Sequence, residues 1–389
     1  MKNMLAVLLA AAPVATAASV ANGYAPVFTP IPNEYTALKV LALTKQAVSD
    51  FNISFAKIQS PACNSGNIAR RQEYGALSKS ERLDYINAVK CLMALPNRTP
   101  ANVAPGARSR FDDFIVTHLQ QTRTIHFTGN FLAWHRWFVW NYENALRTEC
   151  GYKGWQPYWD WPKWASAPQD SPMFNGDPYS LSGNGQYVPH NQTAANIPNG
   201  LGGGYVTTGP FANMITNLGP VDLANAVPGP DGGLGYNPRR FKRDVGPAVA
   251  TQNTNYTSVL DLLSRATFDD FNLVLQGSLT QATLGLHGGG HYTINGDPGG
   301  DVYISPGDPG FWIHHGNVDR MWTLWQAMDP ANRQLALGVG NYSHITWGND
   351  PVSRLTSLDD VISIGYAGPN TTIRDIMNTT SSLMCYYYD

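Results

Sequence analysis

The sequence has few charged residues. Only 14% of its 389 residues are charged and the formal net charge is −2, whereas about a quarter of an average soluble domain is charged. A net charge this small argues against a partner that binds through charge. We therefore expect that neither nucleic acid nor a membrane surface is a partner. Hydrophobic residues make up 43% of the chain, which is ample for one large core.

Long apolar runs are also missing. The apolar stretch 4–12 is too short to span a bilayer, and nothing later in the chain comes close. Because Lys2 precedes this stretch and the small residues of 15–17 follow it, we predict a signal peptide over residues 1–17. A buried N-terminal helix is the alternative. Residues 18–389 are then expected to form a single domain.

Secretion is supported by the glycosylation sequons, Asn-x-Ser/Thr, which mark surface sites in secreted proteins. We therefore expect a secreted, extracellular glycoprotein whose glycans supply the solvation that its few charges do not. The sequons lie at Asn52, Asn97, Asn191, Asn255, Asn341, Asn370 and Asn378.

Cysteine is scarce as well. The four cysteines are too far apart in sequence to suggest a metal-binding knuckle. An even number in a secreted chain implies two disulfides, with three connectivities open. We favour Cys63–Cys91, joining neighbouring N-terminal segments, and Cys150–Cys385, which would fix the C-terminus.

Histidines are grouped in two regions of the chain. Apolar residues at spacings of three and four predict helices over 109–121 and 130–148, and His118 and His135 lie on or beside their buried sides. His126 follows in the short turn between them. A single buried histidine is usually structural, but three on adjacent elements of an aromatic-rich segment favour a metal site.

A second group lies within 286–325. His287 and His291 are four residues apart and therefore share one helical face. Gly288 stands where a zinc-protease motif requires glutamate, so that class of enzyme is excluded. His314 and His315 follow on a further helix, where neighbours diverge by roughly 100°, so that both cannot face one metal. Spacing alone does not choose between them.

The remaining pattern predicts a mainly α fold with long loops and few short strands. The segment 165–250 is rich in Gly, Pro, Asn and Ser and is expected to form surface loops. His190 and His344, each beside a sequon, are read as surface residues. The further predicted helices are 34–51, 78–95 with a Ser78/Glu81 capping box, 267–276, and 308–328 capped by Asp308.

Six imidazoles with no cysteine or carboxylate nearby restrict the metal. Imidazole suits copper, zinc, iron and nickel, but non-haem iron prefers a carboxylate ligand and a hydrolytic dizinc pair usually has a bridging one. Three imidazoles per ion suit two copper ions, each of which can give one electron to dioxygen.

At these residues the sequence resembles the superfamily of tyrosinases, catechol oxidases and molluscan-type hemocyanins. The first three histidines, with LAWHRWFVWNYENALR and the later PYWDW, match its first copper site. His287, His291 and SPGDPGFWIHHGNVDRMW match its second. The resemblance covers roughly 60–325 and is strongest to short secreted fungal polyphenol oxidases of the catechol oxidase and o-aminophenol oxidase kind.

The resemblance implies a central four-helix bundle in which a pair of helices supplies each copper. It also implies that His315 rather than His314 is a ligand. Phe311 would pack over a ligand ring, while Asp319 and Arg136 would orient ligands or hold the bundle by charge pairing. Gly288, Tyr292 and Val302 match positions at the substrate entrance; packing roles at a helix end and a strand edge are the alternatives for the last two.

Several departures from the family pattern bear on activity. Thr124 stands where many relatives have a cysteine cross-linked to a histidine, so no thioether is expected. Gln276 stands near the place of a glutamate that helps deprotonate monophenols, and an amide cannot accept a proton as a carboxylate does. Gly288 replaces the Asn or Asp of many tyrosinases. No C-terminal domain that would plug the site follows Cys385, so the pocket is expected to be open.

We therefore expect an enzyme that oxidises o-diphenols, and o-aminophenols, with O2 as the co-substrate and two copper ions as the cofactor. A tyrosinase with substantial monophenol hydroxylation is the main alternative; an oxygen carrier and a zinc protein are the others. The glycines 288–290 should each weaken a helix by roughly 1 kcal/mol relative to alanine, and we expect them to leave space beside the metal.

Overall fold

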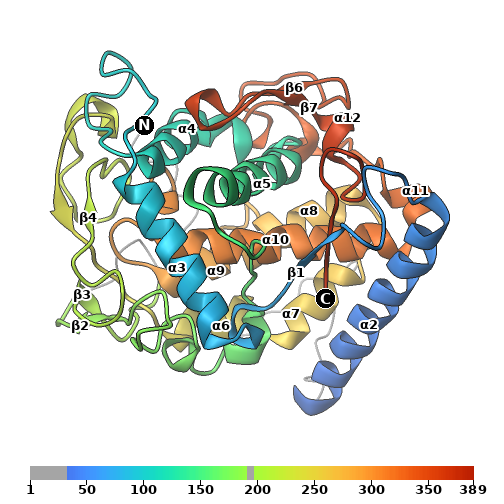
Figure 1. Ribbon diagram of the computed structural model, residues 1–389, viewed down its shortest axis with the longest axis horizontal. Coiled ribbons are helices and arrows are strands. Elements are labelled where there is room, and N and C mark those ends of the chain that lie inside the picture. The colour runs from blue at the N-terminus through green and yellow to red at the C-terminus, as the bar shows by residue number, and fades with distance from the viewer. Residues whose placement is uncertain (1–32, 191–196) are drawn as a thin grey trace, which may run out of the picture.

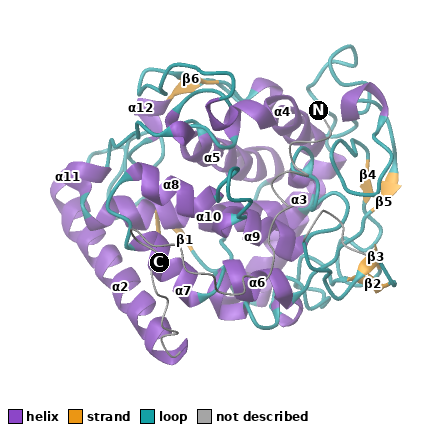
Figure 2. Ribbon diagram, turned by 180° about the vertical axis from the view of Figure 1, so that it is seen from behind, coloured by secondary structure: helices purple, strands orange, loops and turns teal. Residues whose placement is uncertain are grey.

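The computed structural model describes residues 33–190 and 197–389. The proposed signal peptide and the sequon at Asn191 therefore lie outside the described residues. The fold is mostly helical, as predicted, and Figures 1 and 2 show the helices surrounding a helical centre. The helices are α2 (Asn33–Ile58), α3 (Lys79–Ala94), α4 (Arg110–Ile125), α5 (Phe131–Cys150), α6 (Pro247–Asn253), α7 (Tyr256–Leu263), α8 (Phe268–Gln276), α9 (Gly285–Ile294), α10 (Pro309–Met328), α11 (Pro330–Arg333) and α12 (Ile373–Ile376).

The centre of the fold is the bundle of α4, α5, α9 and α10, and Figure 1 shows α10 crossing the middle of the molecule with α5 alongside. Residues 309–326 of α10 are all buried, as expected of a helix that the core surrounds. Asp308 caps it as predicted, by accepting a hydrogen bond from the Gly310 N–H at 2.7 Å. The predicted capping box of Ser78 and Glu81 also begins α3.

Two predicted helices proved too short. Helix α2 continues to Ile58 instead of ending near 51. Helix α4 continues to Ile125, so residues expected in a turn form its last turn. His126 is the first residue beyond the helix, and this position directs it toward the same interior as His118.

Strands are few and short, again as expected, and every described strand belongs to a two-stranded pair. The pair β1–β8 is parallel and the others are antiparallel. Figures 1 and 2 place β2 to β5, from the loop-rich segment, across the molecule from α2. The strands are β1 (Ala69–Arg71), β2 (Gly185–Tyr187), β3 (Gly203–Val206), β4 (Ile215–Thr216), β5 (Arg239–Arg240), β6 (Val361–Ile362), β7 (Thr371–Thr372) and β8 (Tyr386–Tyr388).

The predicted disulfides, Cys63–Cys91 and Cys150–Cys385, are wrong. The structure pairs Cys63 with Cys385 and Cys91 with Cys150. Strand β1 lies beside β8, which brings together the cysteines that precede the two strands. Helix α3 packs on α5, which brings together cysteines near the ends of both helices. Tertiary packing, rather than nearness in sequence, therefore selects the partners.

The two histidines read as surface residues are both engaged. His190 lies between the Val188 carbonyl, 2.7 Å from Nδ1, and the Asp244 carboxylate, 2.8 Å from Nε2. The side chain of His190 is only 16% exposed. The Nδ1 of His344 bonds to the carbonyl of Ser353 and joins two loop segments. Both histidines thus fasten loops, which their sequence context did not indicate.

The six sequons within the described residues differ in exposure. Asn52, Asn341 and Asn370 are exposed, whereas Asn97, Asn255 and Asn378 are partly buried. In the part of the chain that the structure describes, no helix combines the length and apolar character needed to cross a membrane.

Candidate metal centre

The first histidine cluster is built from α4, α5 and the residue that ends α4. Each ring has its Nδ1 beside a backbone carbonyl: His118 at 3.0 Å from Tyr303, His126 at 2.8 Å from Thr122, and His135 at 2.8 Å from Phe131. A carbonyl only accepts hydrogen bonds, so Nδ1 carries the proton and Nε2 the lone pair. All three Nε2 atoms are buried and have no hydrogen-bond partner among the described residues.

The second cluster joins α9 and α10. His287 and His291 lie one turn apart on α9, and His315 approaches from α10. The Nε2 of His291 lies 3.0 Å from that of His287 and 3.1 Å from that of His315. Three imidazole nitrogens that meet at one point suit a shared cation, because lone pairs facing each other without one would repel.

The two clusters face each other across the bundle. The rings of His135 and His315 stack with centroids 4.5 Å apart, and those of His126 and His287 are 5.6 Å apart. In each cluster the candidate ligand atoms lie within 4.8 Å of one another. The first cluster offers three nitrogen donors, and the second offers those of His287, His291 and His315, with a nitrogen of His314 inside the same 4.8 Å limit. The arrangement is therefore that of two metal sites close together.

Burial sets the protonation of these rings. It holds the pKa values of His118, His135, His287, His291 and His315 well below the ordinary histidine value, and it lowers the pKa of His126 to about 4. Neutral imidazoles are the form that binds metals. Among the described residues, neither cluster contains a carboxylate or a thiol, so the donor set matches the copper chemistry that the sequence indicated.

His314 lies beside the second cluster but has a different environment. Its Nδ1 accepts a hydrogen bond from the Trp161 indole N–H at 3.1 Å, and burial lowers its pKa to about 3. Its ring lies against Gly290, where an added Cβ would be 2.2 Å from the ring carbon Cε1. The contacts of His314 are therefore packing contacts, whereas the Nε2 of His315 meets the α9 pair.

The expectation for the glycines 288–290 requires correction. Gly290 allows the His314 ring to lie on α9, and Gly289 allows a close approach of Asn253, whose Cβ would be 2.5 Å from an added Cβ. Only Gly288 lines the cavity beside the clusters. Two of the three glycines thus serve helix packing rather than open space.

The cavity opens onto both clusters and has a volume of about 590 Å³, including the solvent space within it. The three residues expected at the substrate entrance all line it: Gly288 and Tyr292 on α9, and Val302 in a turn and not at a strand edge. The other lining residues are His126, Phe127, Gln276, Thr283, Leu284, His287, His291, Gly299, Gly300 and Trp347.

Gln276, the residue nearest the place of the family's glutamate, lies in this wall. Its Oε1 accepts a hydrogen bond from the Phe127 N–H at 2.6 Å, and its Nε2 donates to the Asn272 Oδ1 at 2.8 Å. Both ends of the amide are therefore fixed by neighbours. Phe127, directly after His126, has a positive φ of 51°, so this bond also helps to hold a strained backbone.

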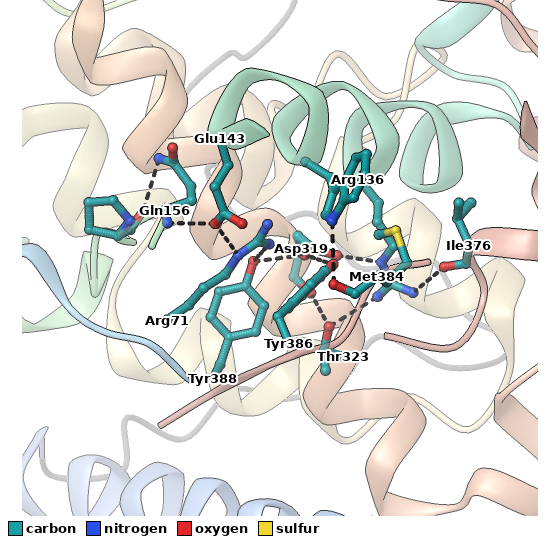
Figure 3. A network of polar contacts seen from close by, with 12 residues as sticks. Arg71, Arg136, Glu143, Gln156, Asp319, Thr323, Ile376, Met384, Tyr386 and Tyr388 are labelled. Atoms are coloured by element: carbon teal, nitrogen blue, oxygen red, sulfur yellow. Dashed lines mark hydrogen bonds and ion pairs between the residues drawn. The ribbon is translucent and has the colours of Figure 1, made fainter. Parts of the chain in front are cut away.

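Asp319, one turn after His315 on α10, is the centre of a buried polar network (Figure 3). Its carboxylate is 2.6 Å from Arg136 Nε and 3.2 Å from Arg71 Nη1, and it accepts the hydroxyls of Tyr386 and Tyr388 at 2.5 and 2.7 Å. Burial alone would raise the pKa of Asp319, but the two guanidiniums overcome it and hold the pKa below its ordinary value.

The family resemblance implied that Asp319 and Arg136 orient ligands or hold the bundle by charge pairing. The structure pairs these two residues with each other, and the other members of the network were not predicted. Arg71 comes from β1 and the tyrosines from β8, and no local pattern links these strands to α10. Alternate tyrosines in the final YYY share one face of a strand, which is the one signal that could have indicated them. Phe311 stacks on the His315 ring with centroids 4.2 Å apart, as expected.

Comparison with known proteins identifies the class. Residues 108–328 match the family described as the common central domain of tyrosinase. The chain is 42% identical over 328 residues to the tyrosinase-like protein orsC of Emericella nidulans, which covers 77% of this chain and 86% of that protein. It is 38% identical over 340 residues to Tyrosinase P of Aspergillus terreus, which covers 84% and 93%.

A solved structure agrees with these matches. A glycine-to-asparagine variant of the polyphenol oxidase from Thermothelomyces thermophila superposes with a TM-score of 0.84 at 55% identity, covering 91% of this chain and 98% of that one. The chain therefore belongs to the tyrosinase family, whose members are copper-dependent oxidases of phenols. The two histidine clusters fit the pair of copper ions that this family implies.

Proposed function

We propose that each cluster binds one copper ion. The ligands are His118, His126 and His135 for the first ion and His287, His291 and His315 for the second. The observation that carries this proposal is the convergence of six neutral imidazoles, five of them buried and that of His291 partly buried. Their Nε2 atoms have no other hydrogen-bond partner among the described residues or face one another. Metal analysis should give two copper ions per chain; zinc in their place would contradict it.

The proposed reaction is the oxidation of o-diphenols to o-quinones, and of o-aminophenols to quinone imines. Bound copper supplies the electron transfer between substrate and dioxygen. Each substrate loses two electrons and two protons, so two substrates convert one O2 to two waters. The cavity positions the substrate ring: Gly288 leaves room beside His287 and His291, and Tyr292 and Val302 line the cavity.

The presence of Gln276 in the cavity wall supports the proposed preference for diphenols over monophenols. A monophenol must lose its proton before it can bind as a phenolate, and a carboxylate in the cavity wall would promote that loss. The Gln276 amide has no carboxylate basicity, and its two ends are already hydrogen-bonded. A tyrosinase with substantial monophenol hydroxylation is the second candidate, supported by relatives that carry the name tyrosinase.

Initial oxygen uptake on 4-methylcatechol, 2-aminophenol and tyramine, without added diphenol, separates the two candidates. We expect fast turnover of the first two substrates and slow, lagging turnover of tyramine. Gln276→Glu should raise the ratio of tyramine to catechol rates about tenfold, which corresponds to roughly 1.4 kcal/mol in the barrier. Gln281→Glu, an exposed residue in the loop after α8, is the matched control. Rapid uptake on tyramine by the unchanged protein would favour the second candidate.

We further propose that the protein is secreted and glycosylated. The exposed side chains of Asn52, Asn341 and Asn370 can carry a glycan without rearrangement. By contrast, the amide nitrogens of Asn97 and Asn255 donate to the carbonyls of Thr99 and Thr251. Protein recovered from the culture medium of a eukaryotic host should lose mass on glycosidase treatment, and an N-terminal sequence that begins near residue 18 would locate the cleavage.

A further inference from the structure

A tryptophan from beyond the family's central domain lines the candidate substrate cavity. Trp347 begins the short turn Trp347–Asn349, which lies outside the matched residues 108–328. The side chain is buried, yet it forms part of the cavity wall. Its indole Nε1 is buried and has no hydrogen-bond partner among the described residues. The part of the ring that faces the cavity is therefore carbon, and it offers an apolar surface.

The wall around Trp347 is apolar as well. Trp347 belongs to a small hydrophobic cluster that is separate from the main core. Three residues that pack on this cluster also line the cavity: Phe127, Leu284 and Tyr292. The Gln276 amide is hydrogen-bonded at both ends, and the Thr283 hydroxyl accepts the Ser278 N–H at 2.8 Å. A group that enters this part of the cavity therefore gains more by burying carbon than by hydrogen bonding.

This wall lies close to the histidine clusters. The centroid of the Trp347 ring is 6.3 Å from that of His126 and 4.8 Å from that of Phe127. One small molecule can therefore reach the clusters and the wall together. The cavity volume of about 590 Å³ leaves room for a diphenol ring that carries a bulky group.

We propose that Trp347 determines substrate specificity by binding an apolar substituent of the diphenol ring. The substrates are o-diphenols that carry a bulky alkyl or aryl group at ring position 4, para to one hydroxyl. The hydroxyls lie at the histidine clusters, while the substituent packs on the wall that Trp347 and Phe127 form. This inference rests on the proposed oxidation of o-diphenols and specifies the substrate class.

Support of the segment after His126 is the competing interpretation of Trp347. The N–H of Gly348 donates to the Phe127 carbonyl at 2.9 Å, so the turn also holds that segment. The ring of Tyr342 packs on that of Phe127 too, with centroids 5.4 Å apart, but Tyr342 is not among the residues that line the cavity. Loss of a support lowers turnover of every o-diphenol, whereas loss of an apolar wall lowers turnover of the substituted ones alone.

The test compares kcat/KM for 4-tert-butylcatechol with that for catechol. We expect Trp347→Ala to lower this ratio about tenfold, the effect of withdrawing roughly 55 Å² of apolar contact at about 25 cal/mol per Å². Trp347→Phe, which keeps an apolar ring, should retain most of the preference. Tyr342→Ala is the matched control, because it removes a ring that packs on Phe127 and leaves the cavity wall intact. Its ratio should equal that of the unchanged protein.

Two results would overturn the proposal: an unchanged ratio in Trp347→Ala, or an equal loss for the two substrates. Failure of the unchanged protein to oxidise either diphenol would instead contradict the proposed function, and binding then decides the proposal separately.

The binding measurement uses two alcohols that are not phenols and so cannot form quinones. In calorimetric titrations of the protein as purified, 4-tert-butylbenzyl alcohol should bind more tightly than benzyl alcohol, with a more negative heat-capacity change. Trp347→Ala should remove this difference, and Tyr342→Ala should keep it. Equal binding of the two alcohols by the unchanged protein would contradict the apolar subsite irrespective of the oxidation chemistry.

Discussion

Replacing Gly290 by alanine tests whether close packing of His314 fixes the helix that carries two candidate ligands. An added Cβ at this position would lie 2.2 Å from Cε1 and 2.4 Å from Nδ1 of the His314 ring. The ring is fully buried and held by the Trp161 N–H, so it has nowhere to move without breaking that bond. At Gly288, two residues earlier, the Cβ would meet only the Leu284 side chain, at 3.3 Å.

The expected free energies follow from these contacts. Alanine at either position stabilises the helix by about 1 kcal/mol relative to glycine. At Gly290, overpacking costs about 1–3 kcal/mol, and leaving the Trp161 donor unpaired costs a further 1–3 kcal/mol or so. Gly290→Ala should therefore destabilise the protein by about 1–5 kcal/mol, whereas Gly288→Ala should stabilise it by up to about 1 kcal/mol.

Urea unfolding of the two copper-free variants measures this difference without dependence on metal affinity. Copper content after reconstitution is the second readout, and it should fall in Gly290→Ala more than in Gly288→Ala because a displaced His314 ring lies beside His287 and His291. Equal stability of the two variants would refute the reasoning, since it would mean that the His314 ring accommodates the extra carbon freely.

Two further predictions concern charged groups away from the cavity. Asp319→Asn leaves the buried guanidinium of Arg136 without its carboxylate and should lower the unfolding free energy by about 3–5 kcal/mol; Asp359→Asn, in an exposed pair, should change it by less than about 1 kcal/mol. His190 donates to the backbone carbonyl two residues earlier and to Asp244, which together raise its pKa. Its stabilising contribution is therefore complete below about pH 6.5 and is lost as the pH rises through the elevated value. His190→Gln should accordingly lower the melting temperature more at pH 5.5 than at pH 8.5, and an equal loss at both would contradict this assignment.

The helical centre could be predicted because its pattern is local. Apolar spacing located α4, α5 and α10, and the four-residue separation of His287 and His291 placed both on one face of a helix despite the intervening glycines. The choice between His314 and His315 was not local. The contact that distinguishes the two rings is the hydrogen bond from Trp161 to His314, which joins residues 153 positions apart in the chain. The family resemblance alone favoured His315 as the ligand, and that assignment stays a proposal.

The disulfide pairing was also determined by contacts between distant segments, and here the prediction from sequence was wrong. Nearness in sequence favoured Cys63–Cys91, but the strands β1 and β8, of three residues each, bring Cys63 to Cys385 across 322 residues. Pairs as short as these carry little pattern of their own, since their stability comes from the tertiary contacts around them. The prediction failed because the determining contacts were between segments whose pairing no local signal encodes.

The strands β1 and β8 also contribute residues that support the candidate metal centre, in addition to the six histidines. His315 and Asp319 are one turn apart on α10, so the contacts of Asp319 also fix the turn that carries the candidate ligand. Arg71 arrives from β1 and Tyr386 and Tyr388 from β8, so segments from both ends of the described chain meet on this carboxylate (Figure 3). The disulfide Cys63–Cys385 joins the segments leading into the two strands. Residues 108–328 contain every candidate ligand, yet Asp319 on α10 is also bound by Arg71, Tyr386 and Tyr388, which lie outside that range.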